Sequence, residues 1–218
     1  MPLPTSDTPH AEPIPAGLHK AICYAIYDLG KQESKMYNKS SPKVLFIWEL
    51  PDHRISLERD GQQVDLPRAL SKTFGNTLSP RGHLRPALEA WRGKAFTTEE
   101  LANFDLFNVL GAPCQLMITH NTSQDGRQFA NIQSVLPWPT GETRPKQPEN
   151  PLASFSFFDV ADGADYTQAL PNNTPDWVKE RLAESEQAKQ AQEDDNGAAF
   201  AAEMATSPED DEDDGCPF

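Results

Sequence analysis

The chain has 218 residues and a formal net charge of −14, from 19 lysine and arginine residues against 33 aspartate and glutamate residues. Residues 1–150 hold 16 basic and 16 acidic residues, whereas 151–218 hold 3 and 17, so the whole acidic excess lies in the last third. No apolar run approaches the roughly 18 residues of a membrane span, and residues 1–5 lack the basic and apolar regions of a signal peptide. The three cysteines are widely spaced, which argues against a disulfide framework and indicates a reducing, cytoplasmic compartment.

The first part of the chain predicts a polar arm and two strands. Residues 1–16 are polar and rich in proline, a composition typical of a disordered arm. Residues 19–29 are apolar and β-prone, and the polar, lysine-containing stretch 31–42 that follows predicts a long basic loop. Val44–Leu50 is the clearest strand, rich in branched and aromatic residues, and Pro51 is expected to end it. Its alternate residues, including Phe46 and Trp48, predict a core-facing stripe.

The next stretch predicts a hairpin followed by short helices. Alternation over 54–58, an Asp60-Gly61 turn and a return over 63–66 indicate two half-buried strands. Apolar residues at helical spacing predict a helix over 83–91, with Gly93 as its C-terminal cap. Residues 97–100 have the form of a capping box, and Asp105 is a candidate cap for a third helix that ends at Gly111. Two more strands are predicted at 115–120 and 128–135, joined by an Asp125-Gly126 turn.

The order strand, strand, hairpin, helices, strand, strand predicts an all-β fold with a helical insert. We expect a five-stranded OB-fold barrel over 17–150, with 54–66 as its third strand or as an added hairpin. A β-sandwich is less favoured because it needs about seven strands and no central helix. After residue 137 the chain becomes richer in proline, and 151–191 is predicted to be loosely ordered, with a short helix at 175–182. Residues 192–218 are predicted to form a disordered acidic tail.

The tip of the acidic tail is the most specific feature of the sequence. Six consecutive acids, Glu209–Asp214, are followed by Gly215-Cys216-Pro217-Phe218. An aromatic ring can enter an apolar pocket while a basic rim holds the acids, so we predict a partner-docking tip; the alternative is a solvated tail that aids solubility. The tip resembles that of bacterial single-stranded DNA-binding proteins, which end in acids and Ile-Pro-Phe, although Cys216 departs from that pattern. The predicted partner-binding residues are Asp210, Asp211, Glu212, Asp213, Asp214, Pro217 and Phe218.

A second signal is the interleaving of aromatic and basic residues. Single-strand binders need cations that follow phosphates and flat rings that stack on bases, and a stacked ring tolerates any base. Tyr37, between lysines in the predicted loop, is the best stacking candidate, whereas any other single aromatic residue is more commonly part of a core. The candidate DNA-binding residues are Lys31, Lys35, Tyr37, Lys39, Lys43, Arg54, Lys72, Phe74, Arg127 and Phe129.

Signals for catalysis are weak. The sequence has no glycine-rich phosphate loop, no His-Glu-x-x-His and no Gly-x-Ser-x-Gly. The acids at Asp52-His53 and Glu99-Glu100 would suit a nuclease site, but such acids are more common in surface turns and at helix starts. The histidines lack metal-ligand spacing, so we expect no enzyme activity, no metal and no cofactor.

The middle of the chain resembles a family of small tailed-bacteriophage proteins that are treated as OB-fold single-stranded DNA-binding proteins. The resemblance runs from about residue 17 to 185 and rests on the order and spacing of several short motifs. These are Trp48-Glu49-Leu50-Pro51, Leu70-Ser71-Lys72-Thr73-Phe74, Leu84-Arg85, Trp91-Arg92-Gly93-Lys94-Ala95-Phe96-Thr97, Phe104-Asp105-Leu106, Leu110-Gly111-Ala112-Pro113-Cys114, Ala130-Asn131-Ile132 and Pro175-Asp176-Trp177-Val178.

The resemblance implies a protein that coats single-stranded phage DNA during replication and recombination, in the host cytoplasm. The expected partners are single-stranded DNA and, through the acidic tip, replication or repair proteins; no membrane partner is expected, and an oligomer is compatible with the sequence. Two alternatives stay open: an OB-fold module that binds proteins and not DNA, and a nuclease accessory factor.

Overall fold

The computed structural model describes residues 12–34, 39–59, 61–145, 147–161 and 164–190. The strands are β1 (Gly17–Ser34), β2 (Lys39–Arg59), β3 (Gln62–Gly75), β4 (Pro113–Thr122), β5 (Gln128–Leu136) and β6 (Ala153–Phe155). The α-helices are α1 (Leu84–Arg92), α2 (Thr98–Ala102) and α3 (Asp176–Ala183). The 3₁₀ turns are η1 (Leu106–Val109), η2 (Phe157–Asp159) and η3 (Tyr166–Ala169).

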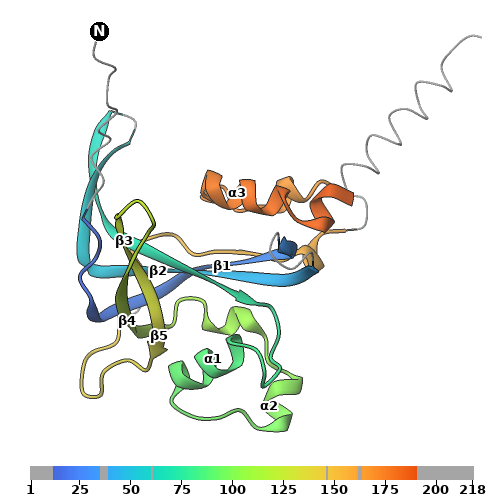
Figure 1. Cartoon of the computed structure of the whole chain (residues 1–218), viewed down its shortest axis with the longest axis horizontal. Helices are drawn as coiled ribbons and strands as arrows, with labels where there is room; N and C mark the ends of the chain where they lie inside the picture. Colours follow the sequence, from blue (N-terminus) through green and yellow to red (C-terminus); the bar gives the residue numbers. More distant parts are fainter. Residues whose placement is uncertain (1–11, 35–38, 60, 146, 162–163, 191–218) are drawn as a thin grey trace, which may run out of the picture.

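Five strands form one strongly curled antiparallel sheet, a half-barrel with the order β3-β2-β1-β4-β5. The bend lies in β1, which pairs with β4 over Gly17–Ile22 and with β2 from Ile22 onward. Where β1 leaves β4, the short strand β6 takes over as its neighbour and pairs in parallel with Ala25–Tyr27. Figure 1 shows α1 and α2 on one side of the curled sheet and α3 on the other.

The inner face of the curl holds the main core. Val44, Phe46, Trp48 and Leu50 of β2 are all buried there, as the alternation over 44–50 predicts. The rings of Phe46 and Trp48 stack with their centroids 5.4 Å apart. Helix α1 packs against this core through the apolar residues on the side of the helix that faces the sheet. They are Leu84, Leu88 and Trp91.

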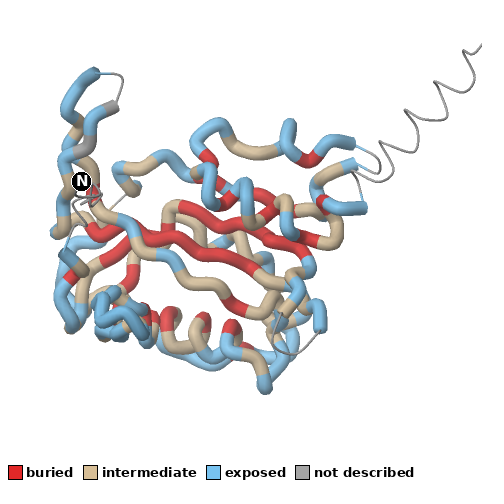
Figure 2. Tube along the Cα trace, turned by 45° about the horizontal axis from the view of Figure 1, so that its top comes forward, coloured by how far each residue is buried: buried red, intermediate tan, exposed pale blue. Residues whose placement is uncertain are grey.

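The outer face of the sheet holds a second core. Leu45 and Ile47 of β2 point to this side and are buried by residues from β6, η3 and α3, among them Phe155 and Val178. The run over 44–50, apolar except for Glu49, is therefore a strand that is buried on both faces, as the red tube in Figure 2 shows for the middle of the sheet. The segment 151–191 was predicted to be loosely ordered, but residues from its described parts, 151–161 and 164–190, pack on this face, and the predicted helix at 175–182 corresponds to α3.

Local capping signals in the sequence are confirmed. Gly93 ends α1 in the left-handed conformation, with φ of 72°, and donates its N–H to Ala90 O. Thr97 and Glu100 form both hydrogen bonds of the capping box at α2. Asp105 caps η1, which is a single 3₁₀ turn and ends before Gly111. The strands predicted at 115–120 and 128–135 are β4 and β5.

Three predictions about the strands and the arm are wrong. The stretch 31–42 is not a loop: β1 continues to Ser34 and β2 begins at Lys39, because polar residues can extend a two-stranded ribbon beyond the core. Pro51 does not end β2, because an irregularity between Leu50 and Arg54 absorbs the proline within the strand. The described end of the predicted disordered arm, 12–16, packs against the domain: Ile14 is 1% exposed, and its carbonyl lies 2.8 Å from His120 Nε2.

Candidate nucleic-acid interface

The two ends of the curled sheet, β3 and β5, face each other along a seam. Neither strand pairs with the other in the part of the sheet that the structure describes, since β3 pairs only with β2 and β5 only with β4. Lys72 of β3 bridges the seam instead: its Nζ donates to the carbonyl oxygens of Ile132 at 2.6 Å and of Gln133 at 3.3 Å. The seam is thus held at one point and has a groove at each end.

The Arg68 groove, at one end of the seam, has a volume of about 710 Å³. It is lined by Arg68 and Leu70 of β3, by residues 127–130 at the start of β5 with Ser123, and by residues 12–14. Arg68 has no ion pair among the described residues, while Arg127 lies 3.4 Å from Asp125, measured from Nε to Oδ2. The ring of Phe129 is 48% exposed, which is unusual for a large aromatic residue on a strand. This groove therefore combines two guanidinium groups with an accessible aromatic ring, and Glu12 is the one acid in its lining.

The Lys43 groove, at the other end, has a volume of about 570 Å³. Its lining comes from β2, β3, the start and middle of α1, and residues 133–135 of β5, and it includes Lys43, Lys72 and His83 but no acid. Lys43 makes no ion pair with any residue that the structure describes. Both grooves therefore present positive charge, and the seam joins them along one side of the sheet.

Lys72 and Phe74, two of the predicted DNA-binding residues, lie at the seam and have partners within the protein. The Lys72 ammonium is committed to β5 carbonyls and lies over the Phe74 ring at 5.4 Å, and burial lowers its pKa. Phe74 is only 6% exposed and packs edge-to-face on Phe46, so its ring belongs to the core. Both residues build the walls of the Lys43 groove and hold its shape.

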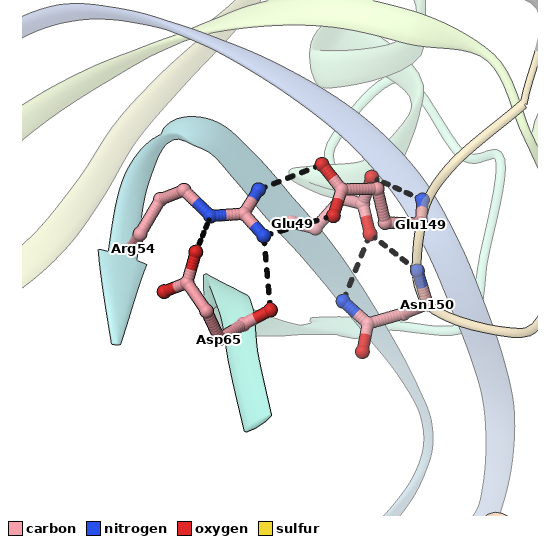
Figure 3. A network of polar contacts seen from close by, with 5 residues as sticks. All are labelled: Glu49, Arg54, Asp65, Glu149 and Asn150. Atoms are coloured by element: carbon pink, nitrogen blue, oxygen red, sulfur yellow. Dashed lines mark hydrogen bonds and ion pairs between the residues drawn. The ribbon is translucent and has the colours of Figure 1, made fainter. Parts of the chain in front are cut away.

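Arg54, another predicted DNA-binding cation, is paired with acids of the protein (Figure 3). Its guanidinium donates to both carboxylate oxygens of Glu149, at 2.8 and 3.1 Å, and to Asp65 Oδ2 at 2.6 Å. These hydrogen bonds, with Glu149 first, raise the pKa of Arg54, and two carboxylates compensate its single charge. Beside it, the fully buried Glu49 carboxylate accepts hydrogen bonds from Glu149 N, Asn150 N and Asn150 Nδ2, all at 2.8 Å. The network ties residues 149–150 to β2 and leaves Arg54 little charge to offer a phosphate.

The remaining predicted residues lie away from the seam or outside the described residues. Lys31 is exposed near the end of β1, with its Nζ 3.6 Å from Glu186 Oε2. Lys39 is exposed at the start of β2. The candidates Lys35 and Tyr37 lie outside the described residues, as does the whole predicted docking tip, Glu209–Phe218. Of the ten predicted DNA-binding residues, the structure brings five to the seam, namely Lys43, Lys72, Phe74, Arg127 and Phe129.

Sequence reasoning missed Arg68. The signal was present, because Arg68, Leu70, Lys72 and Phe74 alternate as one face of a strand, but the hairpin return was predicted to stop at 66. Extending the strand through this alternation would have put Arg68 on the same face as Lys72.

Other chemistry is sparse in the described part of the chain. Within it, no group of three or more histidine, cysteine, aspartate or glutamate side chains could hold a metal ion. Cys23 and Cys114 are free thiols that are fully buried. Among the described helices, none has the length and apolar character needed to cross a membrane.

The comparisons with known proteins found no match for this chain. No protein-family model matches the chain, and neither a curated protein nor a solved structure matches it.

Proposed function

We propose that the half-barrel is an OB-fold and that it binds single-stranded DNA without sequence preference and without catalysis. The observation that carries the proposal is the seam between β3 and β5, with the Lys43 groove at one end and the Arg68 groove at the other. The strand order and the helix between β3 and β4 match the OB arrangement, in which the face of strands 2 and 3 and the adjoining loops bind oligonucleotides.

The chemistry of the seam suits a flexible, acidic chain with flat bases. Lys43 and Arg68 can each neutralise a phosphate, and Phe129 offers a ring on which a base can stack. Stacking contributes about 1–3 kcal/mol per base and does not distinguish one base from another. The local balance of charge at the seam therefore favours DNA although the whole chain is acidic.

Titration of labelled oligo-dT, followed by fluorescence anisotropy, tests the proposal. With roughly three to four phosphates neutralised, the logarithm of the affinity should fall by about 2 to 3 for each unit of log salt. An affinity that does not change with salt, or no binding at low salt, contradicts the proposal.

Matched variants place the binding surface. Phe129→Ala should weaken oligo-dT binding by about tenfold, while Phe158→Ala, which removes a 92% exposed ring far along the chain in η2, should leave it unchanged. Arg68→Gln should lower the salt slope by about 0.7, whereas Lys94→Gln, a cation outside both grooves, should not. Equal effects within either pair would rule out the seam as the DNA site.

Recruitment of replication or repair proteins by the acidic segment Glu209–Asp214 is the second part of the proposal, and sequence alone supports it. A chain in which these six acids are replaced by asparagine and glutamine should lose such a partner in pull-down experiments and keep its oligo-dT binding. Loss of partner binding with Phe129→Ala, and not with the changed tail, would instead favour the protein-binding module. Cleavage of the oligonucleotide in the presence of Mg²⁺ would favour the nuclease alternative.

A further inference from the structure

A third cavity opens on the side of α1 that faces away from the Lys43 groove. It has a volume of about 380 Å³, within the range of small-ligand sites, and we call it the Trp138 pocket. It lies between α1, the segment with α2 and η1, and residues 137–144. Its main lining residues are Trp91, Arg92, Phe96, Phe104, Trp138 and Arg144.

Two polar side chains of the Trp138 pocket already have partners. Trp91 Nε1 donates to Pro113 O at 3.1 Å. Arg92 donates to both carboxylate oxygens of Glu100, at 2.6 and 3.2 Å, and its guanidinium lies 4.3 Å from the centre of the Phe96 ring. These contacts fix the aromatic walls and leave Arg92 as a compensated charge.

Three polar side chains in the lining, those of Asn108, Trp138 and Arg144, make no hydrogen bond or ion pair with any described residue. Trp138 Nε1 is shielded from solvent and has no hydrogen-bond partner. Arg144 is exposed and makes no ion pair with any described residue. The exposed Asn108 amide can both donate and accept hydrogen bonds, and the Lys20 ammonium lies 5.8 Å from the centre of the Trp138 ring. The pocket therefore suits a flat apolar group that carries acceptors and a negative charge.

We propose that the Trp138 pocket takes one nucleobase of the strand that lies in the seam, with the neighbouring phosphate on Arg144. This inference rests on the proposed function. Continuity along the chain supports it: residues 133–135 of β5 line the Lys43 groove, and Pro137 and Trp138, just beyond β5, line the pocket. Helix α1 is the shared wall, since it gives Pro86, Ala87 and Ala90 to the groove and Leu88, Trp91 and Arg92 to the pocket.

A nucleobase supplies the hydrogen-bonding groups and the flat ring that would occupy the pocket. Every nucleobase has hydrogen-bonding groups on its edges for the Asn108 amide and an apolar face for the aromatic walls, so the contact tolerates sequence. A strand held there passes around α1 and gains one stacked base and one phosphate contact beyond those of the two grooves.

The test compares the full chain with Trp138→Phe, which leaves a smaller ring on the pocket wall, and with Arg144→Gln. Trp177→Phe, in α3 on the opposite side of the sheet, is the control. With oligo-dT of about 16 nucleotides, Trp138→Phe should lower the affinity about five- to tenfold and Arg144→Gln should reduce the salt slope by about 0.7. With about 4 nucleotides, too short to fill seam and pocket together, the variants should bind like the wild type.

Photocrosslinking gives a readout that does not depend on the stability of a variant. An oligonucleotide with 5-iododeoxyuridine should crosslink to a peptide that contains Trp138 in the wild-type chain. Crosslinks confined to peptides of β3 and β5, or pocket variants that bind the longer oligonucleotide normally, would overturn the pocket and leave the seam intact. If the wild type binds no oligonucleotide at all, the proposed function fails with it. A Trp138→Phe chain that keeps its DNA affinity but loses binding to a peptide of residues 209–218 would show that the pocket holds an acidic protein segment.

Discussion

Replacing Glu49 by glutamine should weaken the fold more than any change of charge on the surface. The Glu49 carboxylate is fully buried and accepts three hydrogen bonds, one on Oε1 from Glu149 N and two on Oε2 from Asn150. A glutamine can keep its carbonyl oxygen at the Oε2 position, but its NH₂ group then faces the Glu149 N–H. One charge-assisted hydrogen bond is lost, and a donor stands against a donor.

The expected cost follows from that arrangement. Losing a hydrogen bond to a charged acceptor and leaving its donor unpaired costs about 2–4 kcal/mol. The neutral amide avoids the cost of burying a carboxylate, which offsets part of this, so we expect a loss of about 2 kcal/mol in the free energy of unfolding. With a urea m-value of about 2 kcal/mol/M, the unfolding midpoint should fall by about 1 M.

Urea unfolding followed by tryptophan fluorescence measures this shift. Glu58→Gln, an exposed acid on the same strand, is the control and should change the midpoint little. If Glu49→Gln unfolds at the same urea concentration as Glu58→Gln, the buried network does not hold residues 149–150 to the sheet and the reasoning is refuted.

Three further measurements test other parts of the fold. Gly30→Ala should destabilise the chain by about 1 kcal/mol more than Gly61→Ala in thermal melts. Both glycines have positive φ, but a Cβ at Gly30 would lie 2.5 Å from a side-chain oxygen, whereas a Cβ at Gly61 would meet nothing within 4 Å. Equal losses of stability would show that the whole cost comes from the backbone conformation. The pKa of Glu100 is lowered from 4.5 to about 2, and the hydrogen bond from Arg92 is the largest cause. The ionised carboxylate therefore stabilises the fold fully above pH 4.5, and this stabilisation is lost as pH falls through about 2. The difference in Tm between wild type and Glu100→Gln should shrink over this pH range, and a constant difference would argue against the Arg92–Glu100 pair. Burial raises the pKa of Cys23 and Cys114, so mass spectrometry should find these two thiols labelled by a thiol reagent only after unfolding, and rapid labelling in the native protein would contradict their burial.

The parts of the fold that sequence analysis found are those with local signals. The Thr97–Glu100 capping box and the Gly93 cap depend on residues a few positions apart, and both are present. The double burial of 44–50 was missed because its outer cover comes from β6 and α3, and nothing near β2 in sequence indicates that cover. The half-barrel follows from the order of the elements, but the bend in β1 is visible only once β4 and β6 are placed.

In the candidate site, too, sequence analysis found only the features that have a local signal. Pairing of basic and aromatic residues located Arg127 and Phe129 at the seam. It did not indicate the ion pair of Arg54, because the acid that binds both guanidinium Nη atoms, Glu149, lies 95 positions away. It did not indicate the hydrogen bonds of Lys72 either, because the acceptors are backbone carbonyls of β5, which no side-chain pattern reveals.

The pairing of β1 with β2, β4 and β6 also decides how the chain can fold during synthesis. β1 is among the first segments to leave the ribosome, yet the neighbours of Gly17–Ile22 and of Ala25–Tyr27 are β4 and the much later Ala153–Phe155. Pairings across such separations make folding slow, in the range of milliseconds to seconds, since the loop-closure entropy is lost before the contacts form. Until β6, η3 and α3 have emerged, Leu45 and Ile47 lack the residues that bury them, so a nascent or truncated chain that ends before residue 153 carries an apolar sheet face open to aggregation.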